Sequence, residues 1–466
     1  MSEAVATQQQ GQAGKYRPYP EYKDSGVEWL GIIPTHWSLH ALKRTVSDCS
    51  NGIWGDEPNG ESDLIVLRVA DFDRNKLTIS DDKLTYRSIS ERERKTRLLK
   101  KGDLLIEKSG GGEKTLVGCV VLFDKEYSAV TSNFVAKMSP REAFCSNFLS
   151  YAFSHLYAGR VNYPSIKQTT GIQNLDSESY LMEHFCFPDS SEQQTIAAFL
   201  DYETARIDRL IAKQQQLIEL LKEKRQAVIS HAVTKGLNPD APMKDSGVEW
   251  LGQVPEHWVA SRLKYCTRQI VDGAHFTPTY TDAGVPFLRV TDIQSKHVDL
   301  SEVKYIPEAE HNELIKRCNP KKGDLLLSKN GTIGVPKLVD WDWSFSIFVS
   351  LCLIKFKAKL FAEYVAYCFE SHELKEQIFG LIKQSTVINL HLDKIQNFWI
   401  CVPPISEQVE IVEALKNKVD ELDLLINKAA NAIELMQERR TALISAAVTG
   451  KIDLRGWTPP TDEVAA

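Results

Sequence analysis

Apolar residues recur at alternating steps of four and three along two long stretches of the chain, and this pattern predicts two long helices. The first stretch, Ser191–Thr234, returns without a gap as Ser406–Thr449, at a constant offset of 215 residues. In the first stretch, alternating steps of four and three residues select Ile196, Leu200, Glu203, Ile207, Leu210, Gln214, Leu217, Leu221, Lys224 and Val228. In the second stretch, the same steps select Ile411, Leu415, Lys418, Leu422, Leu425, Ala429, Ala432, Met436, Arg439 and Leu443. Both series are mainly apolar, as in the a/d seam of a coiled coil, so the two seams are expected to bury each other.

Each predicted helix opens with Ser-Glu-Gln, which indicates a Ser N-cap followed by an acid and an amide in the first turn. Neither stretch contains Pro or Gly before Gly236 and Gly450, which are expected to end the helices. At about 1.5 Å per residue, an unbroken helix of this length spans roughly 60 Å. An ordinary amphipathic helix packed on its own domain is the alternative, but the length and the matching seam favour a coiled coil that acts as a spacer.

The duplication also covers the segments that precede the two helices. The opening Lys23–Trp37 (KDSGVEWLGIIPTHW) recurs as Lys244–Trp258 (KDSGVEWLGQVPEHW), at an offset of 221 residues. The same offset relates two further pairs of motifs, LRVAD at 67–71 with LRVTD at 288–292, and KGDLL at 101–105 with KGDLL at 322–326. The sequences between these motifs barely resemble each other and are rich in Gly, Asn and Pro. This arrangement predicts one scaffold that carries two different surface loops.

Short strand patterns and helical patterns occur together in each half, with helices expected around Phe148–Leu156 and Phe361–Phe379. The predicted fold class is therefore α+β, with two repeated globular domains separated by two long helices that form an antiparallel coiled coil. The expected parts are a flexible N-terminal arm at 1–21, a globular domain at 22–190, a long helix at 191–235, a linker at 236–243, a second globular domain at 244–404, a second long helix at 405–449 and a tail at 450–466.

Composition fits a soluble protein of two to four domains, with 466 residues, 43% hydrophobic and 25% charged. No apolar run approaches the roughly 18–20 residues that cross a bilayer, and the N-terminus lacks a signal-peptide pattern, so a cytoplasmic location is expected. The nine cysteines occur singly, which predicts buried thiols. The net charge of −6 does not by itself indicate a nucleic-acid binder. However, the run Arg92–Lys101 is locally basic and is either a binding patch or a solvated face.

Several motifs resemble catalytic sites, but each lacks a residue that the site requires or is not repeated in the other half of the chain. The loop Ser109–Thr115 (SGGGEKT) has Glu113 where a phosphate-binding loop needs Gly before the Lys. The carboxylates and lysine within 103–108 resemble a metal-dependent nuclease, but the second half has Ser328 in place of Glu107. His36 and His40 have the spacing of zinc ligands, without an intervening Glu and with Ser261 opposite His40 in the duplicate.

The sequence also lacks the NPPY-like tetrapeptide of amino-methyltransferases, a G-x-G-x-x-G dinucleotide loop and the G-x-S-x-G elbow of hydrolases. We therefore expect no cofactor in this chain and no catalysis by the chain alone.

The repeated motifs resemble the specificity (S) subunit of type I restriction-modification enzymes. The resemblance rests on the W-L-G-x-x-P-x-H-W openings at 29–37 and 250–258, the K-G-D-L-L strands, and the S-E-Q helices that end in A-V-T. It covers nearly the whole chain after Tyr22. It implies two target recognition domains, each reading one half of a bipartite sequence in double-stranded DNA, and an antiparallel coiled coil that binds methylation (M) subunits, two in number. Restriction (R) subunits would complete the complex, with S-adenosylmethionine, ATP and Mg on the partner subunits.

The resemblance also implies that certain polar loops contact DNA. The family's S-x-x-G-T-I-G loop is kept as Ser328–Gly334, while the first half departs from it, and the stretches Lys167–Asn174 and Lys383–Asn389 match family loops near DNA. Amides can pair with adenine and basic side chains with guanine, so polar loop residues are suited to reading bases. With the basic run, the candidate DNA-binding residues are Arg94, Arg97, Lys108, Ser109, Lys167, Thr170, Gln173, His275, Thr277, Lys329, Asn330, Thr332, Lys383, Thr386 and Asn389. An ordinary surface loop is the alternative at each position.

Two other functions remain open on the sequence. One is a coiled-coil interaction scaffold that does not bind DNA, which the low overall charge allows. The other is an enzyme whose site has no recognisable motif. DNA binding that weakens as salt rises separates the first of these from a specificity subunit.

Overall fold

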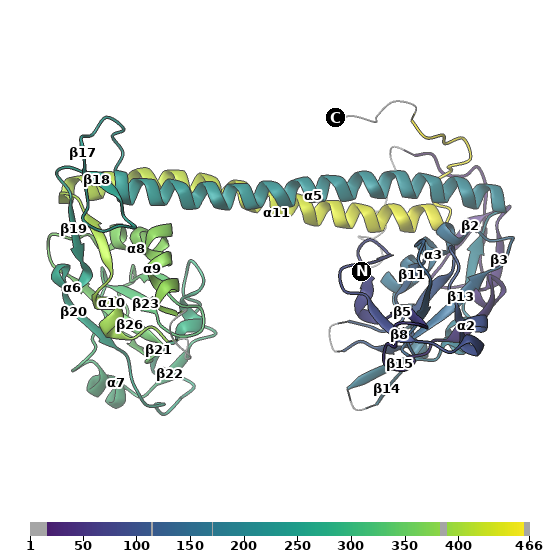
Figure 1. Ribbon diagram of the computed structural model, residues 1–466, viewed down its shortest axis with the longest axis horizontal. Coiled ribbons are helices and arrows are strands. Elements are labelled where there is room, and N and C mark those ends of the chain that lie inside the picture. The colour runs from purple at the N-terminus through teal and green to yellow at the C-terminus, as the bar shows by residue number, and fades with distance from the viewer. Residues whose placement is uncertain (1–15, 113–114, 170, 383–388, 461–466) are drawn as a thin grey trace. The chain divides into compact units, whose positions relative to one another are not determined.

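The computed structural model describes residues 16–112, 115–169, 171–382 and 389–460 (Figure 1). The chain divides into two compact units, residues 1–214 with 431–466, and residues 215–430. Each unit holds one globular domain and one half of each long helix. Among the described helices, none is both long enough and apolar enough to cross a membrane.

The first domain is built around a four-stranded antiparallel sheet in the order β11-β9-β13-β4, beside a three-stranded sheet β12-β5-β8 in which β12 and β5 are parallel. The other strands form the sheet β10-β15-β14 and the pairs β1-β2, β3-β16 and β6-β7. Its strands are β1 Tyr22–Asp24, β2 Ile32–Pro34, β3 Ser38–Ala41, β4 Val46–Asn51, β5 Asp63–Leu67, β6 Phe72–Asp73, β7 Thr78–Ile79, β8 Thr85–Ser88, β9 Leu104–Glu107, β10 Ser109–Gly110, β11 Val120–Leu122, β12 Ala129–Thr131, β13 Val135–Pro140, β14 Ile166–Thr169, β15 Ile172–Leu175 and β16 His184–Phe187. Its helices are η1 Leu42–Arg44, η2 Val69–Asp71, α2 Glu91–Arg97, α3 Ser146–Ala158, η3 Tyr163–Ser165 and α4 Ser177–Tyr180.

The second domain repeats this plan with a four-stranded sheet β20-β26-β23-β24 and a three-stranded sheet β22-β21-β25, in which β21 and β25 are parallel. The pairs β17-β18 and β19-β27 correspond to β1-β2 and β3-β16. Its strands are β17 Met243–Asp245, β18 Gln253–Pro255, β19 Val259–Arg262, β20 Thr267–Asp272, β21 Val285–Leu288, β22 Lys304–Ile306, β23 Leu325–Ser328, β24 Pro336–Leu338, β25 Ser346–Ile347, β26 Leu351–Phe356 and β27 Trp399–Val402. Its helices are α6 Leu263–Cys266, η4 Val290–Ile293, α7 Glu308–Leu314, α8 Ala362–Glu370, α9 His372–Ile382 and α10 Leu392–Gln396.

The structure confirms the α+β class and the duplication, and it corrects one predicted helix. The single helical pattern at 361–379 forms two helices, α8 and α9, because Ser371 leaves the helical conformation between them. The Ser371 hydroxyl donates a hydrogen bond to the Cys368 carbonyl oxygen at 2.7 Å, and Leu374 N donates to the same hydroxyl at 3.3 Å. Short side chains of this kind compete with the backbone for hydrogen bonds and so favour helix ends.

The motifs shared by the two halves are turns and clamps of the scaffold. In K-G-D-L-L the Asp shapes the turn before a buried strand, since Asp103 accepts from Lys100 N at 2.8 Å and Asp324 accepts from Lys321 N at 2.7 Å. In L-R-V-x-D the Arg and the Asp close a short 3-10 helix, with Arg68 Nη2 at 2.8 Å from Asp71 Oδ1. The same clamp recurs between Arg289 and Asp292.

The two long helices are α5, Ser190–Lys235, and α11, Ile405–Val448. Gly236 and Gly450 follow them with φ of 78° and 68°, which confirms the predicted ends, because a left-handed residue after a helix favours Gly. The predicted Ser N-caps are wrong. The carboxylate of Asp189 accepts from Glu192 N at 2.9 Å and caps α5, and α11 starts one residue before Ser406.

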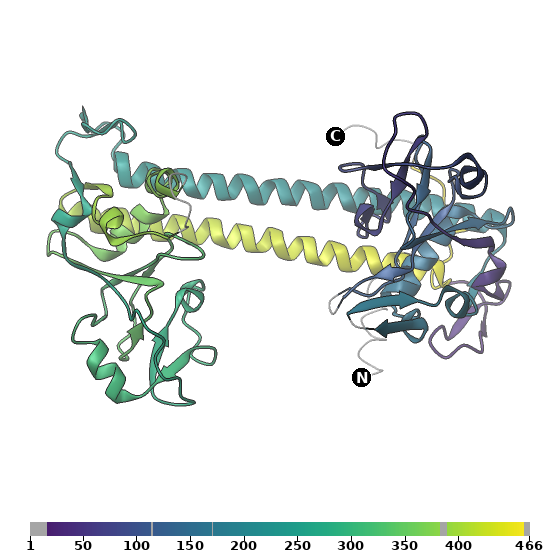
Figure 2. The same cartoon turned by 60° about the horizontal axis from the view of Figure 1, so that its bottom comes forward.

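The two helices run antiparallel and lie side by side within each unit (Figure 1 and Figure 2). In the first unit an ion pair joins Arg440 to Asp208 at 3.2 Å, and in the second an ion pair joins Arg225 to Asp423 at 2.9 Å. These four residues are two equivalent pairs at the 215-residue offset. The same ion pair therefore forms once in each unit.

In the first helix the predicted seam positions Ile196, Leu200 and Glu203 are all buried, and from Ile207 onward the prediction is right only at alternate positions. Ile207, Gln214, Leu221 and Val228 face inward as predicted, but Leu210 and Leu217 are 44% and 42% exposed. Their neighbours Ile211 and Ile218 occupy the inward positions instead, with Ile218 only 8% exposed. In the second helix Val419 is buried beside the half-buried Lys418, and Ile426 is half-buried beside the exposed Leu425, whereas Ala432 and Ile433 are both half-buried.

Each globular domain packs on the start of one long helix and on the end of the other. The core of the first unit includes Phe199 from α5 and Val448 from α11, and the core of the second includes Ile411 from α11 and Val233 from α5. Ordered packing begins earlier than the predicted boundary at Tyr22, because Tyr19 is 3% exposed within the first core. Residues 1–15 of the expected arm lie outside the described residues.

Candidate nucleic-acid interface

Four side chains of the first domain lie close together, with Asn51 at the end of β4, Lys108 just after β9, Ser109 on β10 and Asn174 on β15. Lys108 Nζ donates to Asn51 Oδ1 at 2.8 Å, and the Ser109 hydroxyl donates to Asn174 Oδ1 at 2.6 Å. The two hydrogen bonds are exposed. The segment 108–109 is held by its own backbone, because both amides donate to the carbonyl oxygen of Phe134. We call Asn51, Lys108, Ser109 and Asn174 the polar cluster.

The second domain places a buried ion pair at the equivalent position. Lys329 corresponds to Lys108, and Asp272 corresponds to Asn51, so a lysine–amide contact in one half becomes a lysine–carboxylate contact in the other. Lys329 and Asp272 are both buried, with their charged atoms 2.5 Å apart. His275 lies 3.5 Å from the same carboxylate and is exposed. The charge of Lys329 is therefore neutralised inside the domain, whereas His275 faces solvent.

The β14–β15 hairpin carries two further candidates that differ in their freedom to contact a ligand. Lys167 is exposed and pairs with Asp176 at 2.9 Å, and its pKa is raised by the hydrogen bond to that carboxylate. Gln173 is 5% exposed. Its oxygen accepts from Val117 N at 3.1 Å and its amide nitrogen donates to Gly112 O at 3.2 Å. Its side chain therefore holds the hairpin to the neighbouring loop.

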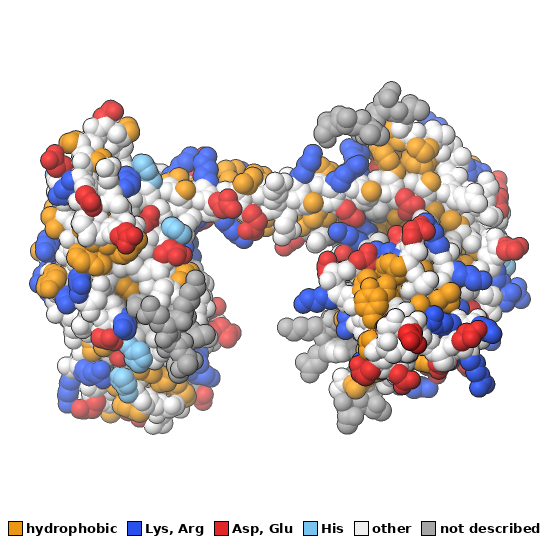
Figure 3. All heavy atoms as spheres, viewed as in Figure 1, with side chains coloured by type: hydrophobic (Ala, Val, Ile, Leu, Met, Phe, Trp, Pro, Cys, Tyr) orange, Lys and Arg blue, Asp and Glu red, His pale blue; other side chains and the backbone are white. Residues whose placement is uncertain are grey.

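Two arginines of the basic run are hydrogen-bonded to the backbone of their own domain. Arg94 donates to the carbonyl oxygens of Ile89 and Ser62, and Arg97 donates to Gly52 O at 3.3 Å. Arg92 and Lys95 are exposed on the same short helix, α2. On the face drawn in Figure 3, basic and acidic side chains are interspersed over both domains.

The remaining candidates lie on loops of the second domain or outside the described residues. Thr277 and Thr332 are exposed, and Asn330 and Asn389 are half-buried, each with a side-chain oxygen that has no hydrogen-bond partner among the residues that the structure describes. Leu390 N donates to Lys329 O at 3.0 Å, so the segments that hold these two asparagines are neighbours. Thr170, Lys383 and Thr386 lie outside the described residues.

Sequence reasoning did not identify an ion pair between Glu107, the last residue of β9, and the half-buried Arg74. Glu107 has a fully buried side chain and accepts from Arg74 Nη2 at 2.9 Å. Burial raises the pKa of Glu107, and the nearby Arg74 guanidinium opposes that rise. Asp103 of the same strand is engaged with Lys100 N and with the Ser139 hydroxyl. The acids that resembled a nuclease site therefore have structural partners.

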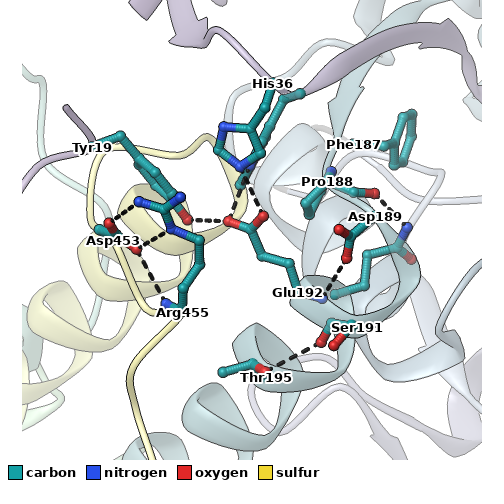
Figure 4. A network of polar contacts seen from close by, with 12 residues as sticks. Tyr19, His36, Phe187, Pro188, Asp189, Ser191, Glu192, Thr195, Asp453 and Arg455 are labelled. Carbon is teal, nitrogen blue, oxygen red and sulfur yellow. Dashed lines mark hydrogen bonds and ion pairs between the residues drawn. The ribbon is translucent and has the colours of Figure 1, made fainter. Parts of the chain in front are cut away.

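Each domain is fixed to the following helix through the Glu of the S-E-Q motif. Glu192 accepts from the Tyr19 hydroxyl at 2.5 Å and from Trp37 Nε1 at 3.2 Å, and lies 2.9 Å from His36 Nε2 (Figure 4). The ion pair between Asp453 and Arg455 lies beside this network, with the Arg455 guanidinium over the Tyr19 ring. In the second unit Glu407 contacts His257 and Trp258 in the same way, at 2.8 and 3.1 Å.

The Gln of the S-E-Q motif ties the start of each long helix to its own domain. Gln193 accepts from Cys145 N at 2.9 Å and donates to Pro188 O at 2.9 Å, and Gln408 accepts from Phe361 N at 2.8 Å. The H-W and S-E-Q motifs are therefore two sides of one joint between a domain and a helix.

The family model for the type I restriction modification DNA specificity domain matches the chain twice, at residues 66–220 and 277–435. Among curated proteins, the specificity subunit of the type I restriction enzyme EcoKI from Escherichia coli K12 is 24% identical over 360 residues, or 75% of each chain. The putative MjaX specificity subunit of Methanocaldococcus jannaschii is 22% identical over 435 residues, or 91% of this chain and 96% of that one.

Two solved structures share the fold. One is a chain from a study of complex assembly and conformational transition in a type I R-M system, with a TM-score of 0.69 at 14% identity, covering 89% of this chain and 98% of that chain. The other is the HsdS subunit of Thermoanaerobacter tengcongensis, with a TM-score of 0.51 at 15% identity, covering 90% of this chain and 98% of that chain.

Proposed function

Because the chain belongs to the type I restriction-modification DNA specificity family, we propose that each globular domain reads one half of a bipartite DNA target. The two half-sites would differ in sequence, since the loops differ between the domains. The long helices would act as the spacer and as the docking site for two methylation subunits, to which restriction subunits are added. S-adenosylmethionine, ATP and Mg would be bound by those partners.

The observation that carries this proposal is the contrast between shared and divergent residues. The two domains share their turns, clamps and helix joints, and they differ at the strand ends where the polar side chains gather. The Lys108–Asn51 contact of one domain is the Lys329–Asp272 ion pair of the other. A duplicated scaffold whose matching edges carry different polar groups is suited to reading two different sequences.

Exposed leucines on the long helices support the docking of partner subunits. In the first unit Leu210 and Leu435 are exposed, and in the second unit Leu217, Leu220 and Leu424 are exposed. They lie outside the seam that the two helices bury in each other. Apolar side chains repeated along the outer face of a helix pair favour a second protein surface.

The experiment that separates this function from an interaction scaffold is DNA binding at several salt concentrations. We expect the chain, with its methylation subunits, to bind duplex DNA with an affinity that falls steeply as salt rises, because each neutralised phosphate releases counterions. A control polyanion such as heparin should compete at low salt and lose to target DNA at high salt. A chain that, with its methylation subunits, shows no salt-dependent binding to duplex DNA would favour the scaffold.

The proposal also predicts the activity of the chain by itself. We expect the purified chain to transfer no methyl group from S-adenosylmethionine and to cut no DNA, because no donor, nucleotide or metal motif occurs in both halves. Incorporation of labelled methyl groups into DNA is the measurement, with the assembled complex as the positive control. Methyl transfer by the isolated chain would contradict it.

A further inference from the structure

Phe134 is an aromatic side chain that the first domain leaves 53% exposed beside the polar cluster. It lies between β12 and β13. Its carbonyl oxygen accepts hydrogen bonds from Lys108 N at 2.8 Å and from Ser109 N at 3.2 Å. The residue is therefore bonded directly to the segment that carries two of the candidate DNA-binding side chains.

The turn around Phe134 is held in place by backbone hydrogen bonds on both sides. Ser132 N donates to Leu67 O at 2.8 Å, and Gly52 N donates to Val135 O at 3.0 Å. The backbones approach so closely that a Cβ on Gly52 would lie 2.1 Å from Ser132 O. The backbone position from which the aromatic ring projects is thus fixed by the fold.

The second domain shows that this turn does not need an aromatic residue. Strand registers place Ser350 at the position of Phe134, and Lys329 N donates to Ser350 O at 2.8 Å, as Lys108 N does to Phe134 O. Ser350 is 6% exposed. The exposed half of the Phe134 ring leaves apolar surface in water, which does not stabilise the scaffold. That surface lies beside the polar cluster and is open to an apolar group of a ligand.

We propose that Phe134 contacts the 5-methyl group of a thymine in the half-site read by the first domain. This inference rests on the proposed function. The side chains of the polar cluster can exchange hydrogen bonds with base edges or phosphates, whereas the Phe134 ring has no hydrogen-bonding group and can contact only an apolar group or the face of a base. In the major groove, the apolar feature that differs between bases is the thymine methyl group. Stacking on a base would require that base to leave the helix, which costs additional free energy.

The test uses the full chain in its complex and a duplex that carries the mapped target. Each thymine of the half-site is replaced in turn by uracil, which lacks only the methyl group. For the wild-type chain we expect one such replacement to weaken binding by about three- to tenfold, as the loss of one buried methyl contact implies. The variant Phe134→Ser, which takes the residue of the second domain, should bind the normal duplex less tightly by a similar factor and should no longer respond to that uracil.

The variant Tyr265→Ser, which removes an equally exposed aromatic side chain from the second domain, is the matched control and should keep the wild-type response to uracil in this half-site. A thermal unfolding curve checks that Phe134→Ser is folded. The inference is overturned if no uracil matters to the wild type, if Phe134→Ser keeps the wild-type response, or if it weakens every duplex regardless of uracil, as a stacking ring would. A wild-type complex with no preference for its target over a scrambled duplex would instead overturn the proposed function.

Discussion

Glu192 and Glu407 occupy equivalent positions but differ in how much they hold together. Glu192 has a nearly buried carboxylate with polar contacts to Tyr19, His36 and Trp37, whereas Glu407 is more exposed and, among the described residues, has side-chain polar contacts only with the equivalents of His36 and Trp37. In the sequence, both glutamates belong to the predicted start of a long helix. The additional partner, Tyr19, belongs to a segment that looked like a flexible arm.

The first prediction compares these two carboxylates. Glu192→Ala leaves the Tyr19 hydroxyl and the Trp37 indole without an acceptor, and each orphaned buried donor costs roughly 1–3 kcal/mol. We expect Glu192→Ala to lower the free energy of unfolding more than Glu407→Ala does. Urea unfolding gives the two values, and hydrogen exchange should show the loss of protection around the first joint. Equal effects of the two substitutions would contradict the role assigned to Tyr19.

The second prediction concerns His155, a residue of α3 whose ring packs against the stacked rings of Trp29 and Phe185. Burial lowers the pKa of His155 to about 4. Since the unfolded chain binds this proton near pH 6.5, the stabilising effect is complete above that pH and is lost as the pH falls toward 4, by up to roughly 3 kcal/mol. The variant His155→Phe keeps a ring and removes the titration. The difference in unfolding free energy between variant and wild type should grow over this pH range, and parallel curves would contradict it.

At the scale of elements, the pattern of apolar residues predicted where the long helices lie but not which face they bury. After Ile207, a step of three residues leads to Leu210 and a step of four leads to Ile211. Both residues are apolar, so the sequence of one helix does not show which of them lies in the seam. At these two steps the structure places Ile211 and Ile218 in the seam and leaves Leu210 and Leu217 exposed. The N-cap was missed for a similar reason, since Asp189 and Ser191 are both good caps and only the geometry of the joint selects between them.

The third prediction tests the phase of the seam with two adjacent residues. Ile218→Ala empties an inward position and should cost about 2–4 kcal/mol, whereas Leu217→Ala removes an exposed side chain and should cost less than about 1 kcal/mol. The seam predicted from the sequence gives the reverse order. Chemical unfolding followed by circular dichroism decides between them. If the outward leucines bind a partner, Leu217→Ala should still weaken assembly with the methylation subunits.

At the scale of the whole molecule, the sequence revealed most about the scaffold and least about the surfaces. The repeats exposed the two-domain plan, because the residues shared by the halves are those that build turns, clamps and joints. The candidate binding residues were harder to judge from the sequence. The side chains of Gln173 and Lys329 have groups that could bind DNA, yet both are bonded within the protein. Phe134 could not be identified because nothing in the sequence shows that an isolated aromatic residue is exposed.

The measurement that tests the central claim most directly is the map of methylated sites in a host that carries the chain with its partner subunits. It should be compared with the map obtained after residues 22–188 are replaced by the equivalent domain of a relative. If each domain reads its own half-site, one half of the bipartite target changes and the other keeps its bases. An exchange that altered both halves, or neither, in an active complex would contradict the account.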